Sequence, residues 1–304
     1  MCYDISKFDK SADLERAKMT KKPKYNAIPC ILTQEQFKEF FCPLLPQLAR
    51  GRKPKLPAFK IFGYVLKFLY TGMQWKEIPI DKDPLGNPEI HYSSIFRRYK
   101  KWNNEGLFAQ CFDSSVCLLQ DKGLLDTTIL HGDGSSTVAK KGGDNLGYNG
   151  HKHHKGEKVV AITDRNANVM TPFVTAAGNC NEIRLLKDSL NGLSRIAKLA
   201  KIDLTGSIMS LDGGYDSVAN RKMIFNRGMI PNIKENPRNR KKPKRGRKRI
   251  YNANIFQERF RTVERLFGWE DKFKRLLMRF ERISNNHFGL KLIAFTLINL
   301  RHFC

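Results

Sequence analysis

The order of strand-like and helix-like segments after residue 124 is the feature that most limits the fold of this chain. Residues 125–140 are rich in β-branched side chains, and residues 158–178 have the pattern of a hairpin. An amphipathic helix over 182–200 and a short apolar strand over 208–211 follow. Strands that alternate with helices favour layers built on one sheet. We therefore predict an α/β domain over residues 125–304, with a mixed sheet flanked by helices.

The first part of the chain has a different pattern. Residues 1–28 are polar and lysine-rich and predict a flexible arm, whereas residues 29–124 predict several short helices. One of them, over 93–106, has an apolar face, and basic side chains crowd its other faces at Arg97, Arg98, Lys100 and Lys101. This pattern favours a small all-α, helix-turn-helix-like DNA-binding domain. A helical cap with a solvated charged face is the alternative.

The charge of the chain points to a polyanionic partner. The 304 residues include 55 Lys and Arg against 29 Asp and Glu, a formal net charge of +26. Such an excess favours nucleic acid, with binding that weakens as salt rises. The seven cysteines are an odd number without a C-x-x-C pair, which argues against a disulfide framework and fits a reducing compartment. With no signal peptide and no apolar run long enough for a bilayer, we expect a cytoplasmic protein without a membrane partner.

Three carboxylates are candidates for chemistry. Asp133 lies in or near the end of the first strand, Asp212 ends a later strand, and Glu264 lies on a helix that must pack on the sheet. Strand ends of one sheet meet at one edge, so these side chains can converge. Close carboxylates require cations, and Mg²⁺ prefers such oxygen ligands. Two Mg²⁺ ions can activate a nucleophilic oxygen and stabilise a leaving one, and in so basic a chain the natural substrate is a phosphodiester.

Glu264 alone is ambiguous. Phe256, Phe260, Val263 and Phe267 recur at helical spacing and predict an apolar stripe, with Glu264 at its edge. A carboxylate there is either a structural ion-pair partner or a ligand in a cleft.

The surroundings of these three acids resemble the DDE motifs of bacterial insertion-sequence transposases, most closely the insertion sequence five family. The matching phrases are HGDGSST around Asp133, SLDGGYDS around Asp212 and TVERLFGWEDKFKRL around Glu264, with further similarity between residues 31 and 301. The chain departs from the family pattern near the third acid. Phe260 and Asp271 stand where the family has basic residues, and Arg261 and Lys272 lie one step away.

This resemblance implies a ribonuclease H-like catalytic core that performs DNA transposition. It implies that Asp133, Asp212 and Glu264 hold two Mg²⁺ ions, with Mn²⁺ able to substitute. Water would cut the transposon end, and the freed 3′-OH would attack target DNA. The implied partners are double-stranded DNA, both terminal inverted repeats and target, and a second copy of the chain, as a dimer or larger assembly on DNA. A catalytically inactive DNA-binding protein and a ribonuclease H-fold nuclease without strand transfer are the alternatives.

Other charged residues have competing interpretations. Asp216 is a rival carboxylate or a helix N-cap, and Asp164 has the pattern of a turn residue. Glu270 and Asp271 are expected to form solvated pairs with Lys274 and Arg275. Trp269 fits core packing better than base stacking. The three histidines over 151–154 lack a second ligand cluster for zinc and favour a DNA-facing segment.

The candidate DNA contacts outside the helical domain are basic side chains in three places. They lie beside the histidines, in the basic run 238–249, and on the helix that contains Glu264. The residues are Lys152, Arg240, Lys244, Arg245, Arg261, Arg265 and Lys272. The run 238–249 is equally consistent with a solvated loop. We expect the Glu264 helix to extend to residue 283, with a kink at Gly268 or burial on two sides, because its apolar stripe changes face there.

Overall fold

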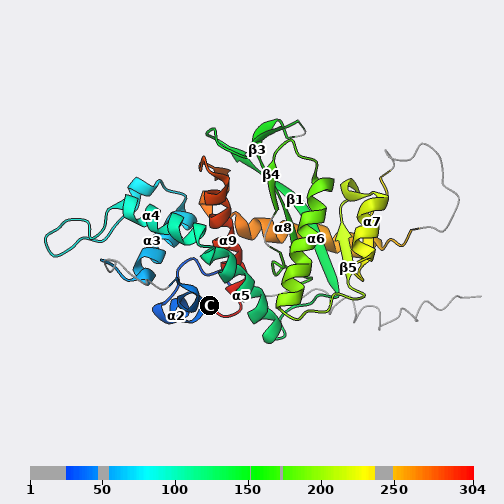
Figure 1. Ribbon diagram of the computed structural model, residues 1–304, viewed down its shortest axis with the longest axis horizontal. Coiled ribbons are helices and arrows are strands. Elements are labelled where there is room, and N and C mark those ends of the chain that lie inside the picture. The colour runs from blue at the N-terminus through cyan, green and yellow to red at the C-terminus, as the bar shows by residue number, and fades with distance from the viewer. Residues whose placement is uncertain (1–24, 47–54, 151, 172–173, 237–248) are drawn as a thin grey trace, which may run out of the picture.

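A computed structural model gives the fold of this protein, and it describes residues 25–46, 55–150, 152–171, 174–236 and 249–304. Most of the predicted arm, residues 1–24, lies outside these ranges. The helices before the sheet are α2 (Gln34–Phe40), α3 (Ala58–Thr71), α4 (Tyr92–Asn104) and α5 (Leu107–Asp121), with the short helices η1 (Cys42–Leu44) and η2 (Trp75–Glu77). They fill the left half of Figure 1. The helical character predicted for this part of the chain is therefore present.

Seven strands form one mixed sheet within the described ranges. They are β1 (Ile129–Ala139), β2 (Gly147–Asn149), β3 (His154–Thr163), β4 (Val174–Ala177), β5 (Ile208–Leu211), β6 (Ile230–Ile233) and β7 (Met278–Arg279). Strand β1 pairs antiparallel with β3 and parallel with β5, and β5 pairs parallel with β6. Strand β4 pairs with β3, and β7 pairs with the end of β1. The mixed sheet confirms the predicted α/β class.

Helices cover both faces of this sheet. Helix α6 (Glu182–Leu199) packs against β3 and β4, whereas α8 (Ala253–Glu270) crosses β1, β5 and β6. Figure 1 shows α6 in front of the sheet and α8 behind it, with α7 (Val218–Phe225) at the β5 end. This arrangement is consistent with the ribonuclease H-like fold that the sequence resemblance implied. No helix in the described part of the chain is long and apolar enough to cross a membrane.

The helix that contains Glu264 is shorter than its sequence pattern predicted. Helix α8 ends at Glu270, and the chain then forms η5 (Lys274–Leu276) and strand β7. The apolar residues Phe273 and Leu276 are buried in these later segments, so the second stripe does not belong to one continuous helix. The prediction that this helix extends to residue 283 was therefore wrong, and with it the basis for expecting a kink at Gly268 or burial on two sides. The stripe changes face because the chain leaves the helix to pair β7 with β1.

Helix α9 (Ser284–Leu300) joins the helical segment to the sheet. It is buried along almost its whole length and packs mainly against α5. Asn103 of α4 donates a hydrogen bond to the carbonyl oxygen of Asn285 (2.8 Å), and the Tyr99 hydroxyl donates to that of Asn286. Gly289 faces these side chains, where a Cβ would lie 2.3 Å from the Asn103 amide oxygen. The close contact between α4 and α9 therefore requires glycine at this position.

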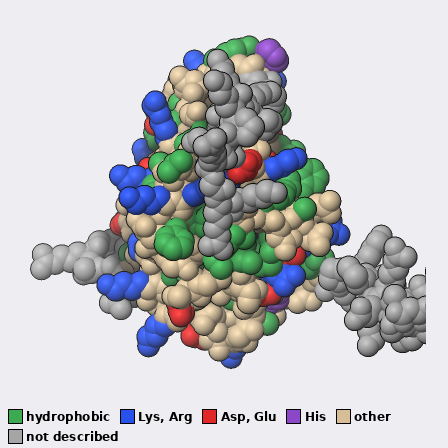
Figure 2. All heavy atoms as spheres, turned by 90° about the vertical axis from the view of Figure 1, so that its right-hand side faces the viewer, with side chains coloured by type: hydrophobic (Ala, Val, Ile, Leu, Met, Phe, Trp, Pro, Cys, Tyr) green, Lys and Arg blue, Asp and Glu red, His purple; other side chains and the backbone are tan. Residues whose placement is uncertain are grey.

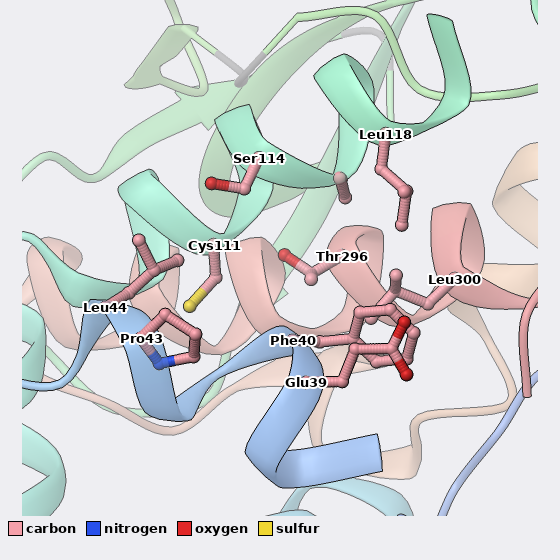
Figure 3. Close-up of a pocket in the computed structure, with 10 residues that line it drawn as sticks. Glu39, Phe40, Pro43, Leu44, Cys111, Ser114, Leu118, Thr296 and Leu300 are labelled. Carbon is pink, nitrogen blue, oxygen red and sulfur yellow. The ribbon is translucent and has the colours of Figure 1, made fainter. Parts of the chain in front are cut away.

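A cavity of about 230 Å³ lies where α2 meets α5 and α9. Figure 3 shows Phe40, Pro43 and Leu44 facing Cys111 of α5 and Thr296 of α9 across this space. The C-terminus lies beside α2 in Figure 1, and the ring centroids of Phe40 and Phe303 are 6.2 Å apart. The lining is mostly apolar and comes from the joint between helices, away from the carboxylates of the sheet.

A buried ionic group fixes β3 to β7 and to the start of α9. The Arg279 guanidinium is 1% exposed and donates to the Glu157 carboxylate (2.9 Å) and to Asp144 (2.7 Å). Glu157 is itself 2% exposed and also accepts from Asn145 (3.0 Å) and from the Ser284 hydroxyl. Because each charge is paired and hydrogen-bonded, burial of the pair is tolerated.

We expect the Glu157→Gln variant to unfold more easily than the wild type. The substitution keeps the side-chain shape but leaves the buried Arg279 charge with one fewer anionic partner. Breaking a buried pair costs about 3–5 kcal/mol. Urea and thermal unfolding would measure this loss. Glu77→Gln, which removes a surface carboxylate that is 61% exposed, is the matched control and should leave stability unchanged. Equal stability of both variants would contradict a stabilising role for the buried pair.

Candidate active site

Two of the three predicted acids lie side by side on neighbouring parallel strands. The β1–β5 register pairs His131 with Ser210, so Asp133 and Asp212 occupy the next equivalent positions, two residues further along each strand. Neighbouring strands lie about 4.8 Å apart, and residues two apart share a face. Strand β5 ends at Leu211, so Asp212 follows it directly, whereas Asp133 lies inside the longer β1. Gly132 permits this approach, since a Cβ there would lie 2.5 Å from Leu211 Cδ2.

Arg259 of α8 joins the two aspartates. Its Nη1 atom donates to Asp133 Oδ2 at 2.6 Å, and its Nη2 atom lies 3.8 Å from Asp212 Oδ1. The second oxygen of Asp133 accepts from the Gly134 backbone N–H at 2.8 Å. Arg259 is only 4% exposed, and its guanidinium lies 5.0 Å from the centre of the Phe256 ring. The structure thus forms a compact group of two carboxylates and one guanidinium.

The two carboxylates differ in their environments. The side chain of Asp133 is 27% exposed and that of Asp212 is 52% exposed. Burial raises the pKa of the Asp133 carboxyl above its ordinary value, and the negative charge of Asp212 adds to this rise, while Arg259 and the Gly134 N–H oppose it. His131, on the same face of β1, is fully buried, and burial lowers its pKa to about 4. Its imidazole is therefore neutral at neutral pH.

Two contacts near the start of α8 fix its position on the sheet. The Asn232 side chain of β6 accepts from the Asn252 N–H (2.7 Å) and donates to the Asn252 carbonyl oxygen (3.1 Å). Glu258 accepts two hydrogen bonds from Arg165, at 2.6 and 3.1 Å. Asn252 also caps the helix by accepting from the backbone of residues 254 and 255. These contacts flank Arg259 and aim its side chain at β1 and β5.

Glu264, the third predicted acid, lies on the exposed face of α8. It follows Arg259 by five residues, which places it about 140° further around the helix. The structure therefore brings Asp133 and Asp212 together but does not bring Glu264 to them. Across the described ranges, no three His, Cys, Asp or Glu side chains are grouped closely enough to hold a metal ion.

The apolar stripe predicted for α8 does not coincide with the face of the helix that is buried. Phe260 is 59% exposed, whereas Thr262, Val263 and Leu266 are buried together with Arg259. Arg259 was missed because a search for apolar periodicity treats an arginine as a surface residue. The signal was nevertheless present, since Arg259 lies three, four and seven residues before these buried positions, on the same helical face.

Asp216 is not the N-cap that the sequence suggested as one of its roles. Ser217 caps α7, and Asp216 instead accepts hydrogen bonds from the Arg221 guanidinium (2.9 Å), the Arg249 guanidinium (2.5 Å) and the Asn236 backbone N–H (3.0 Å). The pKa of Asp216 is lowered, because these contacts outweigh the effect of burial. Asp216 thereby ties together residues 236 and 249, which lie on either side of the basic run.

Three other interpretations can be compared with the structure. Glu270 is 6% exposed and pairs with the buried Lys291, so the prediction of a solvated pair was wrong. Trp269 is 9% exposed, which confirms core packing. Asp164 accepts from the Asn168 N–H at 2.7 Å and is confirmed as a turn residue.

The candidate DNA-contacting side chains are spread over several surfaces. On α4, Arg97, Lys100 and Lys101 are exposed and Arg98 is half-buried. Lys152, Arg261 and Lys272 are also exposed, while Arg265 is half-buried against Tyr25. Arg240, Lys244 and Arg245 lie outside the described residues, as does His151. Figure 2 shows Lys and Arg side chains along the margins of the face at the α7 end of the molecule.

The aspartate pair provides part of the oxygen ligand set that a hard divalent cation needs. Carboxylates from two adjacent strands are the oxygen ligands that Mg²⁺ takes together with phosphate groups. The burial of Asp133 already requires a positive partner, which Arg259 supplies in this structure. The structure therefore places side by side two of the three acids that the resemblance implied.

Comparison with known proteins agrees with this geometry. Residues 119–300, more than half of the chain, match the family described as the transposase DDE domain. The chain belongs to this family. The match begins within α5 and includes both aspartates and α8.

A curated relative is a putative transposase for insertion sequence element IS402 from Burkholderia cepacia, 28% identical over 139 residues. That alignment covers 45% of this chain and 57% of the relative, so the chain spans just over half the length of the protein that it matches. No solved structure matches the chain.

We expect Asn232→Ala to loosen α8 from the sheet. The substitution removes both hydrogen bonds to the Asn252 backbone and leaves those groups partly buried, which costs about 1–3 kcal/mol. Chemical unfolding would measure the loss. Asn254→Ala, which changes an exposed asparagine of the same helix, is the control and should change stability by less than about 0.5 kcal/mol. A loss as large in the control would show that Asn232 has no special part in holding α8.

Proposed function

We propose that this protein binds the ends of an insertion sequence and catalyses metal-dependent DNA strand cleavage and strand transfer. Membership of the transposase DDE domain family supports transposition as the process. The observation that most supports the site is the placement of Asp133 and Asp212 at equivalent positions of two parallel strands, beside one shared guanidinium. The resemblance to the insertion sequence five family supports the finer assignment.

Asp133 and Asp212 are the proposed metal ligands, with Glu264 as the third acid. Mg²⁺, or Mn²⁺ in its place, would supply an activated nucleophilic oxygen and stabilise the leaving one. Asp212, whose side chain is half exposed, would meet incoming DNA first, whereas Asp133 is held from within by Arg259 and Gly134. Glu264 reaches the pair only if α8 turns or shifts when DNA binds. Substrate binding can drive such a conformational change and so assemble a catalytic site.

The helical segment is the proposed DNA-binding part. Helix α4 presents Arg97, Lys100 and Lys101 on its exposed side, while Ile95, Tyr99 and Trp102 are buried. The side chains Lys152, Arg261, Arg265 and Lys272 would contribute further phosphate contacts near the sheet. Transposition joins two ends, so we propose at least a dimer of the chain on DNA.

A binding protein without catalytic activity is the second candidate. It is favoured by the placement of Glu264 on the outer face of α8 and by the arginine that already donates to Asp133 and lies 3.8 Å from Asp212. A nuclease that cuts without joining differs from the main proposal only in its product.

A strand-transfer assay with Mg²⁺ tests these proposals. We expect Asp133→Asn, Asp212→Asn and Glu264→Gln each to lower cleavage and joining by about 10²–10³-fold, since each removes several kcal/mol of charge stabilisation. DNA binding, measured in parallel by fluorescence anisotropy, should remain. Normal joining by Glu264→Gln would exclude it as the third acid. DNA binding without cleavage by the wild type would favour the binding protein, and cleavage without joining would favour the nuclease.

The contribution of α4 is tested by the salt dependence of DNA binding. The double variant Arg97→Gln/Lys100→Gln should weaken binding to all sequences and reduce the slope of log K against log salt by about 2. Lys187→Gln/Lys198→Gln removes two exposed charges from α6 and serves as the matched control. If both double variants change the slope equally, α4 is not a specific DNA-binding surface.

A further inference from the structure

We propose that Arg259 acts as a permanent cation beside the aspartate pair. Its guanidinium stabilises the two carboxylates when metal is absent, and it competes with a divalent cation for them. This inference rests on the proposed function, because it assigns metal binding to Asp133 and Asp212. It concerns a residue of this chain that the DDE motif does not include. It predicts that the affinity for metal is set by an arginine on α8 as well as by the acids.

The first support is the fit of the guanidinium between the two acids. Its two terminal nitrogens point to different carboxylates, Nη1 to Asp133 and Nη2 to Asp212. A 2.6 Å contact between a guanidinium and a carboxylate is a short, charge-assisted hydrogen bond. The planar fork of arginine suits such a bridge, which a flexible ammonium group reproduces less well.

The second support is the burial of Arg259. The side chain is 4% exposed, and its Nε atom has no hydrogen-bond partner among the described residues. A buried cation with one unsatisfied donor is costly unless its remaining contacts compensate. Those contacts are the two aspartates and the face of the Phe256 ring. The contacts with the aspartates therefore explain why Arg259 is buried, which packing alone does not.

The third support is the balance of charge. Asp133 and Asp212 contribute two negative charges and Arg259 contributes one positive charge, while Glu258 is paired separately with Arg165. The group retains a net negative charge on its Asp212 side, which is the more exposed side. A divalent cation is attracted to this side but meets the positive charge of Arg259 and an Asp133 oxygen that is already bonded. Metal and arginine therefore oppose each other.

Metal binding by the full-length protein, without DNA, tests this inference. Isothermal titration and the electron paramagnetic resonance of free Mn²⁺ would give affinities for the wild type, Arg259→Gln and Arg259→Lys. We expect Arg259→Gln to bind Mn²⁺ about tenfold or more tightly than the wild type, because a unit charge beside a carboxylate changes ion affinity by at least this factor. Arg259→Lys keeps the charge but not the planar fork, so it should bind Mn²⁺ less tightly than Arg259→Gln.

Thermal unfolding provides a second readout. In EDTA, Arg259→Gln should lower the Tm by about 5–10 °C, since two close carboxylates lose their cation. Mn²⁺ should restore most of this loss, and it should raise the Tm of the wild type less. Arg184→Gln, which removes an exposed charge from α6, is the control and should change neither readout.

The outcomes separate the inference from the proposed function. Equal Mn²⁺ affinity of wild type and Arg259→Gln, with a Tm loss that Mn²⁺ does not restore, would make Arg259 a structural residue and overturn the inference. If Asp212→Asn abolishes Mn²⁺ binding in that case, the proposed metal site still stands. If Asp212→Asn has no effect on Mn²⁺ binding, either alone or combined with Arg259→Gln, the proposed metal site itself is wrong.

Discussion

The contact between Arg259 and Asp133 connects the two layers on which the site depends. One partner lies on the first strand of the sheet and the other on the helix that crosses it, so the contact fixes the rotation of α8 as well as its position. Buried charges tolerate little displacement, because a shift that breaks the pair leaves each charge without compensation. The buried face of α8 therefore contains the arginine, whereas Phe260, which the sequence pattern placed inside, is exposed and Phe256 and Phe267 are half-buried.

Much of the fold could be predicted because local patterns and tertiary structure agree. The short strand before Asp212 and the turn at Asp164 appear where their sequence signals lie. The aspartate pair was also predictable, since strand ends of one sheet converge. Buried charged residues, in contrast, could not be predicted from the sequence. Arg259, Glu157 and Lys291 are charged residues in the interior, and hydrophobic periodicity assigns such residues to the surface.

The end of α8 shows a second limit of sequence patterns. Phe273 and Leu276 continue a helical spacing, yet they lie at the two ends of the η5 segment, after α8 has ended and before β7 pairs with β1. Their spacing reflects burial near α3 and α9 rather than one helix. Tertiary pairing and the ionic contacts of Arg275 and Arg279 determine where the helix ends. The pairing with β1 and the contact between Arg279 and Glu157 involve residues that are distant in sequence, so a search by local period does not detect them.

The aspartate pair also depends on the small size of Gly132, a property that is independent of charge. A Cβ at this position would lie 2.5 Å from Leu211 Cδ2, so a larger residue would displace the buried Leu211 side chain, beside the residues that precede the two acids. The packing next to the carboxylates thus depends on residues without functional groups. Mutational scans confined to charged and polar positions would overlook this dependence.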